Sequence, residues 1–346
     1  MTLRILLQAA PSSSLEQEVL CSDVTTSRPA GGGEEEIMSE ERWEAQCGGF
    51  ISQSQVYHQK EFSAKEFFET YLSADSHPAL YEEVVGFPMR QLHKELSSVL
   101  LNSGVASEFQ SFPVHVFVSP HLNNYFLLPI TTFPGHIKGK TLIEFTLGPV
   151  LFKLLVCCEY FEEITVLEFN DECSMELKKW LKKHPEAIDW THVSQFACSL
   201  DGKSNGWREK NEKVRERVKQ VIDCDITADT LVAPGVLPPA DCLLCIWGLD
   251  VISKDQDDFQ KNLEKMAALL KCGGHLLLFG TINAKLYKVG EHSFHIVNYD
   301  EEFLRKALRD CGFGFENLEN RPRGEFSDSI IYDSFVYVRA RKVRNP

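Results

Sequence analysis

The sequence has little positive charge, and no cluster of it large enough to form a nucleic-acid-binding surface. Lysine and arginine number 36 against 50 aspartates and glutamates, so the formal net charge is −14 at pH 7. Binding to a phosphate backbone or an anionic membrane depends on clustered cations. The basic run KKWLKK at 178–183 has acidic neighbours and is interpreted as the solvated face of a helix. We therefore expect neither nucleic acid nor membrane as a partner.

The sequence also lacks a long apolar run. No segment approaches the roughly 20 residues of a membrane-spanning helix, and the amino-terminal MTLRILLQAA is too short for the apolar core of a secretory signal. The 11 cysteines are odd in number and scattered through apolar runs, as buried reduced thiols are. Cys242 and Cys245 form a C-x-x-C within a predicted strand, where residues three apart point to opposite faces, so we expect no metal site. These features predict a cytoplasmic protein.

Two segments lack hydrophobic periodicity. Residues 1–50 carry PSSS, RPAGGG and EEE and are predicted to form a disordered tail, in which Met38 is an alternative start. Residues 102–135 are rich in Pro, Phe and Asn and are interpreted as an insertion. The remaining chain, 51–346, is predicted to be one domain, because its length suits a single large α/β unit.

Between these segments, apolar runs typical of strands alternate with amphipathic helices. We predict strands at 141–146, 163–169, 241–247 and 274–280, and helices at 61–72 behind the N-cap Ser63, 88–101, 149–160, 171–184, 208–221 and 256–271. A helix at 301–311 and two strands, FGFENLEN and SFVYVRARK, follow as an antiparallel finish. This alternation predicts a doubly wound, mainly parallel sheet with helices on both faces, and a ligand crevice at the carboxyl ends of its strands.

The loop after the first strand and the acid after the second strand are candidates for a nucleotide-type ligand. The loop contains Gly148, and Glu168 follows 20 residues later, at a spacing that suits a carboxylate bound to ribose hydroxyls. Buried βαβ units also acquire a glycine and an acid by chance, so this spacing leaves both interpretations open. Asp225 either accepts an adenine amino group or caps a turn, and Asp250 can cap the helix that follows it.

Several stretches together resemble a known family. They are LIEFTLGPVLFKLL, EITVLEFNDECSMELKKWLKKHPEAIDW, VKQVIDCDIT, LPPADCLLCIWGLD, LLKCGGHLLLFG and LYKVGEHSF. They are similar, in order and spacing, to the nicotinamide, phenylethanolamine and indolethylamine N-methyltransferases, over about 61–101 and 139–342. The resemblance implies a class I methyltransferase fold, which is Rossmann-like, with seven strands and a reversed last strand. It further implies S-adenosyl-L-methionine as cofactor, a small-molecule substrate and a monomer.

The resemblance also implies which positions face the ligands. The cofactor-binding positions are Phe67, Leu72, Thr146, Leu147, Gly148, Phe152, Glu168, Cys173, Asp225, Ile226 and Ile246, and the substrate-binding positions are Gly280 and Tyr287. Several depart from the family pattern: Thr146 and Leu147 replace Gly-Ser, and Gly280 replaces a substrate-binding acid. Glu168 replaces the usual ribose aspartate and Cys173 an asparagine. Hydroxyl-bearing residues are replaced by Phe67, Leu72, Phe152 and Ile246.

Three interpretations of function remain open. The first is an N-methyltransferase that uses S-adenosylmethionine and acts on a small amine or heteroaromatic nitrogen. Because the sulfonium is a good leaving group, such an enzyme mainly aligns its substrates and excludes water, and no catalytic residue is named. The second is a catalytically impaired methyltransferase-fold protein that acts as a binding or regulatory module. The third is a decayed or mispredicted gene product.

Overall fold

The computed structural model describes residues 61–101, 137, 139–149, 151–203, 205–324 and 329–345. The predicted tail at 1–50 and the predicted insertion at 102–135 lie outside these residues. The description below therefore concerns the part of the chain that was expected to form the sheet and its helices.

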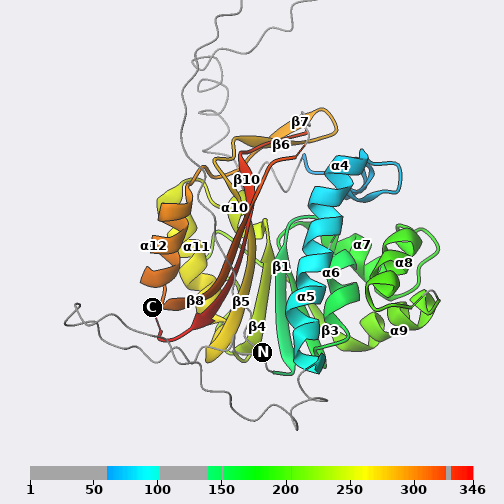
Figure 1. The fold of residues 1–346 in the computed structure, drawn as a ribbon, viewed down its shortest axis with the longest axis horizontal. Helices are drawn as coiled ribbons and strands as arrows, with labels where there is room; N and C mark the ends of the chain where they lie inside the picture. Colours follow the sequence, from blue (N-terminus) through cyan, green and yellow to red (C-terminus); the bar gives the residue numbers. More distant parts are fainter. Residues whose placement is uncertain are drawn as a thin grey trace, which may run out of the picture.

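A seven-stranded sheet in the order β3-β2-β1-β4-β5-β10-β8 forms the centre of the molecule (Figure 1). Its strands are β1 Thr141–Thr146, β2 Glu163–Glu168, β3 Val218–Asp223, β4 Ala240–Ile246, β5 Leu270–Ile282, β8 Phe313–Pro322 and β10 Ser334–Lys342. The pairs from β3 to β5 are parallel, whereas β10 runs antiparallel to both β5 and β8. This order confirms the predicted doubly wound sheet with a reversed last strand.

Helices cover the two faces of the sheet because its inner strands are apolar on both sides. One side carries α5 Phe87–Leu101, α6 Leu151–Cys157, α7 Asp171–Leu181, α8 Thr191–Leu200 and α9 Trp207–Arg217 (Figure 1). The other carries α10 Gly248–Ile252, α11 Gln256–Ala268 and α12 Glu301–Asp310. On α11, the side chains of Phe259, Leu263 and Met266 are fully buried. Each such side chain stabilises the fold by about 1.5–3 kcal/mol relative to its exposed state.

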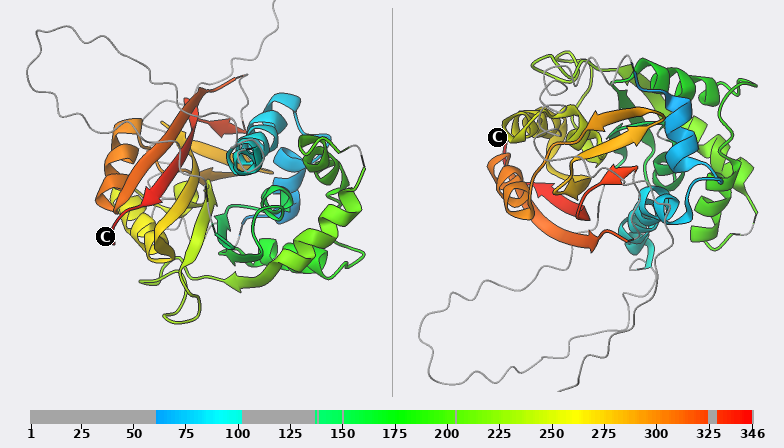
Figure 2. Two further views of the ribbon diagram at one scale, coloured as in Figure 1. Left: turned by 60° about the horizontal axis from the view of Figure 1, so that its bottom comes forward. Right: turned by 90° about the horizontal axis from the view of Figure 1, so that it is seen from above.

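Short elements cover the carboxyl ends of the parallel strands (Figure 2). They are α3 Ala64–Phe67, the π-helix η1 Phe68–Leu72, α4 Pro78–Tyr81, the π-helix η2 Glu82–Gly86, and a small sheet of β6 Leu286–Val289, β7 His292–His295 and β9 Ile330–Ile331. Ser63 caps α3 as predicted, accepting a hydrogen bond from Glu66 N at 3.3 Å. The hydroxyl of Tyr71 joins the two parts of this cover, since it lies 2.6 Å from the carbonyl oxygen of Lys288. π-Helices are rare and often occur at functional sites.

The predicted helix at 208–221 is wrong in its second part. Helix α9 ends at Arg217, and residues 218–223 form the edge strand β3. Among the described strands, β3 pairs with β2 alone, and its side chains are exposed or half-buried. It therefore carries polar residues that resemble a helix surface. Helices α8 and α10, the elements from α4 to η2, and the small sheet were not predicted either.

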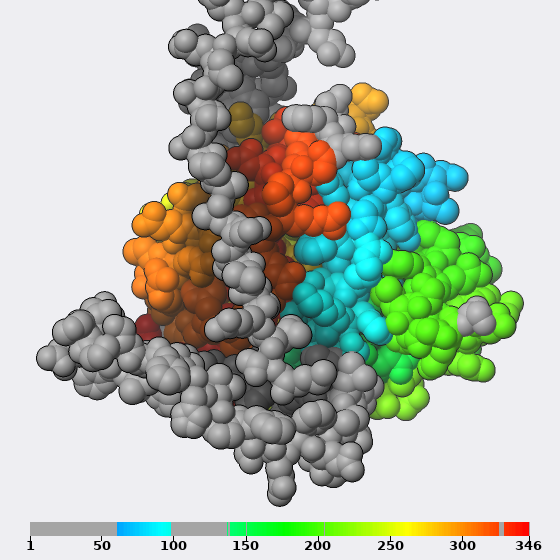
Figure 3. Space-filling model, viewed as in Figure 1, coloured from blue at the N-terminus to red at the C-terminus, as the bar shows by residue number. Residues whose placement is uncertain are grey.

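A buried ion pair links helix α5 to the carboxyl-terminal strands. Arg339 on β10 pairs through Nη1 with Glu95 on α5 and through Nε with Glu316 on β8, the latter at 3.2 Å. Asn317 on β8 donates a second hydrogen bond to Glu95 at 3.2 Å. In the space-filling view α5, in cyan, lies between the green helical part and the orange and brown strands (Figure 3).

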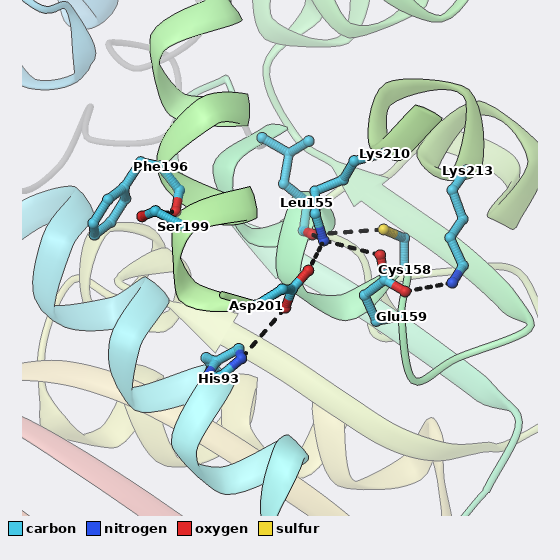
Figure 4. Close-up of polar contacts among 9 residues, drawn as sticks. All are labelled: His93, Leu155, Cys158, Glu159, Phe196, Ser199, Asp201, Lys210 and Lys213. Carbon is cyan, nitrogen blue, oxygen red and sulfur yellow. Dashed lines mark hydrogen bonds and ion pairs between the residues drawn. The ribbon is translucent and has the colours of Figure 1, made fainter. Parts of the chain in front are cut away.

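A second buried cation joins α6, α8 and α9 (Figure 4). Lys210 on α9 directs Nζ to Asp201 Oδ2 at 2.7 Å, Glu159 Oε1 at 2.9 Å and the carbonyl oxygen of Leu155 at 3.3 Å. His93 on α5 lies 3.3 Å from the other oxygen of Asp201. The network therefore connects four helices on one side of the sheet.

Candidate functional site

The strand order reverses between β1 and β4, which is where open α/β sheets bind their ligands. Strand β1 ends at Thr146, and its register partner on β4 is Ile246. Strand β2 ends alongside at Glu168. The sheet thus brings together, at one edge, the three strand ends that the sequence singled out.

The loop after β1 keeps a tight turn at its one glycine. Gly148 has φ +79°, which favours glycine, and a Cβ built there would lie 2.5 Å from Cε1 of Phe67. The ring of Phe67 therefore packs directly on this loop. Leu147 is buried beside it, at 5% exposure. The hydroxyl of Thr146 accepts a hydrogen bond from Ile246 N at 3.3 Å, so this side chain bonds to the neighbouring strand.

The Glu168 carboxyl is held in place by hydrogen bonds from the backbone that follows it. Its Oε1 accepts hydrogen bonds from Phe169 N at 3.0 Å and from Asn170 N at 3.1 Å. Its Oε2 is buried and has no hydrogen-bond partner. Burial raises the pKa of this carboxyl well above its usual range. A donor from a ligand, such as a ribose hydroxyl, would satisfy the open oxygen.

Three more of the predicted cofactor-binding positions follow this carboxyl along the chain or come after the neighbouring strand β3. Cys173 is fully buried, and its N–H donates to Oδ1 of Asn170, the N-cap of α7, at 3.0 Å. Ile226 is buried, whereas Asp225 is exposed. Asp225 Oδ1 accepts from both N and Oγ1 of Thr227, at 2.8 Å and 2.6 Å, so the turn-capping interpretation of Asp225 is present in the structure. Its adenine contact stays a prediction.

The remaining apolar positions belong to the core. Phe152, Ile246 and Leu72 are buried to 1% exposure or less. Lys153, next to Phe152 on α6, is also fully buried, with Nζ 4.8 Å from the centre of the Phe152 ring. A buried lysine at this place was not predicted.

A cavity of about 30 Å³ lies beside the loop. Its walls include Phe67, Tyr71, Leu147, Trp247, Asp250, Thr281 and Tyr287, so the predicted positions 67, 147 and 287 do meet. Trp247 has φ +55°, an uncommon conformation for a large side chain, and its indole Nε1 is buried without a hydrogen-bond partner. An unmatched donor in a strained residue at a cavity wall suits a ligand that carries an acceptor.

Asp250 is the charged group in the cavity wall. It does not cap α11, whose N-cap is Asp255. Instead, Asp250 Oδ2 accepts from N and Oγ1 of Thr281, both at 2.8 Å, and Oδ1 accepts from the Tyr299 hydroxyl at 2.9 Å. Burial raises the pKa of Asp250 to about 7. Sequence reasoning missed this arrangement, because Tyr299 is far from Asp250 along the chain.

Gly280 lies behind this carboxyl. A Cβ built on Gly280 would be 2.3 Å from the Tyr299 hydroxyl and 3.2 Å from Asp250 Oδ1. The space next to the predicted substrate position is therefore taken by Tyr299. Gly280 permits the close approach of the Tyr299 hydroxyl to Asp250.

Replacing Asp250 with asparagine should flatten the pH dependence of stability. The folded-state pKa of about 7 lies above the unfolded value of 3.8, so the native protein holds this proton more tightly. The wild type should therefore lose about 2 kcal/mol of unfolding free energy relative to Asp250→Asn between pH 5 and pH 8. Urea denaturation at four pH values measures the difference. Parallel curves for the two proteins would contradict it.

In the part of the chain that the structure describes, no group of three or more His, Cys, Asp or Glu side chains could hold a metal ion. No helix among residues 61–101 and the later described ranges is long and apolar enough to cross a membrane. Cys242 and Cys245 are both fully buried, and burial raises the pKa of each thiol.

Comparison with known proteins agrees with this geometry. The model of the NNMT/PNMT/TEMT family matches residues 113–343. The chain belongs to this family. Indolethylamine N-methyltransferase of Oryctolagus cuniculus is 34% identical over 295 residues, which cover 85% of this chain and 98% of the relative. Nicotinamide N-methyltransferase of Homo sapiens is 35% identical over 210 residues, 61% of this chain and 80% of the relative.

A solved methyltransferase can also be superimposed on this NNMT/PNMT/TEMT family member. Magnesium protoporphyrin IX methyltransferase of Synechocystis PCC 6803, with bound SAH, gives a TM-score of 0.46 at 9% identity, over 84% of this chain and 99% of that one. Strand order and family membership together establish the class I methyltransferase fold that the sequence predicted.

The cofactor of the NNMT/PNMT/TEMT family is S-adenosylmethionine. At the ribose end of the site the chain fits this group, because Glu168 Oε2 is a buried acceptor without a partner. At the methionine end, the Phe67 ring lies on Gly148, and Leu147 is buried next to the small cavity. At this end the ring of Phe67 therefore occupies the space over the loop.

Proposed function

We propose that this chain is an S-adenosylmethionine-dependent N-methyltransferase that acts on a small amine or heteroaromatic nitrogen. The observation that carries the proposal is the composition of one cavity wall. It joins Leu147 of the cofactor loop to the buried carboxyl of Asp250 and to Trp247, whose indole N–H has no partner. A nitrogen-containing substrate offers groups for both.

The side chains around the cavity would bind, orient and enclose the reactants. The cofactor, when bound, supplies an activated methyl group. Glu168 would accept hydrogen bonds from its ribose, and the loop at Gly148 would lie against its methionine part. Tyr71 and Tyr287 come from the cover over the strand ends and keep water out of the cavity. Asp250, held by Thr281 and Tyr299, would fix the substrate without moving.

A second candidate is a methyltransferase-fold protein that binds but does not catalyse. The contact of Phe67 with Gly148 favours it, because this ring fills space that the cofactor needs. The cavity volume of about 30 Å³ favours it as well, since small-molecule sites measure about 300–1,000 Å³. The two candidates differ in whether the closed loop can open.

Calorimetric titration of the full chain with S-adenosylmethionine and S-adenosylhomocysteine separates the two candidates. Micromolar binding, followed by methyl transfer to a pyridine carboxamide or an arylalkylamine, supports the first. Binding without transfer to either class of acceptor supports the second. No heat and no thermal shift at millimolar ligand would remove the cofactor from both.

The double variant Phe67→Ala with Leu147→Ser should bind S-adenosylhomocysteine about tenfold more tightly than the wild type. The change opens the space over Gly148 and adds a hydroxyl, worth about one good hydrogen bond of 0.5–1.5 kcal/mol. Thr146 is left intact, because its hydroxyl accepts a hydrogen bond from Ile246 N.

The matched control for this variant is Phe62→Ala. Phe62 packs on Phe67, with ring centres 5.3 Å apart, and contributes to the same core. It loosens the aromatic cluster while the Phe67 ring stays over the loop. Equal gains in affinity for the control and the double variant would mean that any loosening of the aromatic cluster improves binding. The Phe67 ring over Gly148 would then not be the specific obstacle.

We further propose that the protein acts as a monomer in the cytoplasm. The cysteines within the described ranges are all free thiols, and they are buried except for Cys272. Reduced thiols suit that compartment. Size-exclusion chromatography with light scattering tests the monomer, and fractionation of expressing cells tests the location.

A further inference from the structure

Three charged side chains are buried together beneath the cofactor loop. Glu144 lies on β1, Lys153 on α6 and Glu168 at the end of β2, with exposures of 0%, 0% and 1%. Burying an isolated charge is costly, so such groups need compensation nearby. Here one cation is placed among two carboxylates.

The contacts within this cluster leave much of its polar capacity unused. Lys153 Nζ lies 3.4 Å from Glu144 Oε1, as an ion pair. The contact of Lys153 with Glu144 is longer than a normal hydrogen bond, and Glu168 Oε2 has no hydrogen-bond partner. The charges therefore interact mainly through space. Burial lowers the pKa of Lys153, and the charges of Glu144 and then Glu168 raise it.

The register of β1 and β2 places Glu168 on the same side of the sheet as Glu144, because Glu144 lies opposite Val166 and residues two apart on a strand share a face. The charge of Lys153 therefore acts on both carboxyls. Burial raises the pKa of the Glu168 carboxyl, and the charge of Glu144 raises it further. Lys153 and the N–H groups of Phe169 and Asn170 act in the opposite direction. The ionised form of Glu168 thus depends on one lysine and two backbone donors.

The other elements around Glu168 bring thiols and one acid that is already paired. Cys173 on α7 and Cys224 after β3 have pKa values raised by burial, so both are neutral thiols. Asp223, the register partner of Glu168 on β3, accepts from Ser174 and pairs with Lys178 at 3.0 Å. Lys153 is therefore the cation that faces the buried carboxylates.

We propose that Lys153 is a positioning residue of the cofactor site, which favours the ionised form of Glu168 that can accept hydrogen bonds from both ribose hydroxyls. This inference rests on the proposed function, because it assigns Glu168 to the ribose. A protonated Glu168 would offer one acceptor fewer and would bind the ribose more weakly. The lysine acts from below the loop and does not touch the cofactor itself.

The test is the pH profile of S-adenosylhomocysteine binding by the full chain, measured by calorimetry from pH 5.5 to pH 9. In Lys153→Met, the pH at which affinity is half lost should rise by about one unit, with about tenfold weaker binding at pH 7. Lys153→Arg, which keeps the charge, should restore part of the profile. Unchanged wild-type behaviour in Lys153→Met would overturn the proposal.

Two further variants keep the test decisive. Glu144→Gln with Lys153→Met removes the ion pair as a whole and protects against failure to fold. In Glu168→Gln, binding should be weak at every pH and should no longer depend on pH. Lys179→Met is the control: Lys179 pairs with Glu176 away from the cluster, so this variant should match the wild type. A Glu168→Gln profile that still follows pH would assign the titration to another group and overturn the proposal.

A readout without ligand separates this inference from the proposed function. The double-mutant cycle of Lys153→Met and Glu168→Gln is measured by urea denaturation at pH 7. The unfolding constants should show coupling of at least about fivefold, because the charges interact in a buried place. No coupling overturns the role of Lys153. Coupling without any binding of S-adenosylhomocysteine by the wild type overturns the proposed function instead.

Discussion

Replacing Lys210 with methionine should lower the free energy of unfolding by about 1–3 kcal/mol, because it removes the buried cation that the half-buried acids Asp201 and Glu159 share. The Lys210 side chain is only 3% exposed. Its Nζ pairs with Asp201 and Glu159 and lies near the carbonyl oxygen of Leu155 (Figure 4). Methionine keeps the length and apolar stem of the side chain, so the change isolates the charge. Urea denaturation at pH 7 measures it.

Lys213→Met is the matched control, because Lys213 pairs with the same acid from a more exposed position. Its side chain is 33% exposed, and such pairs contribute about 0–1 kcal/mol. The difference between the two variants therefore reports burial, since both remove one cation from Glu159. If Lys210→Met is no more destabilising than Lys213→Met, the network in Figure 4 is a surface feature energetically.

The sequence predicted those parts of the fold whose side chains have a regular pattern. Strand β1 was predicted with its observed ends because most of its residues are apolar or β-branched and five of the six are buried. The N-cap residue Ser63 marked the start of its helix correctly, since a capping side chain acts on the next few residues. Local chemistry of this kind is readable without tertiary structure.

The errors occurred where tertiary contacts decide the structure. Residues 218–223 look helical by composition, and they become a strand only because β2 offers an edge to pair with. The π-helices η1 and η2 depend on a hydrogen-bond register that packing selects, and no composition signal marks it. Edge strands and irregular turns are therefore less predictable than the core.

The candidate site was predicted by spacing at Gly148 and Glu168, which now lie at neighbouring strand ends. Lys153 was missed because a lysine in an amphipathic helix normally faces water. Tyr299 was missed because its effect arises through Gly280, a contact that exists only in three dimensions. The missed residues are polar groups that the fold buries, and burial is a property of the whole chain.

Replacing Gly280 with aspartate should also lower the free energy of unfolding by about 3–5 kcal/mol, although it restores an acid of the family pattern. The new Cβ would lie 2.3 Å from the Tyr299 hydroxyl and 3.2 Å from Asp250 Oδ1. It thus combines overlap with a second buried carboxyl beside the first. Chemical denaturation at pH 7 measures the loss, and a thermal scan confirms it.

Tyr299→Leu should rescue Gly280→Asp, because it removes the phenol that occupies the space behind Asp250. The combined variant should regain at least half of the lost stability and should favour a protonated arylalkylamine over a neutral pyridine carboxamide, since two carboxyls then attract a cation. Tyr299→Phe is the control: it removes only the hydrogen bond to Asp250, which costs about 0.5–1.5 kcal/mol, and leaves the ring in place. If Gly280→Asp alone is as stable as the wild type, the Tyr299 side chain can move aside at little cost. The contact of Tyr299 with position 280 would then not explain why a glycine stands there.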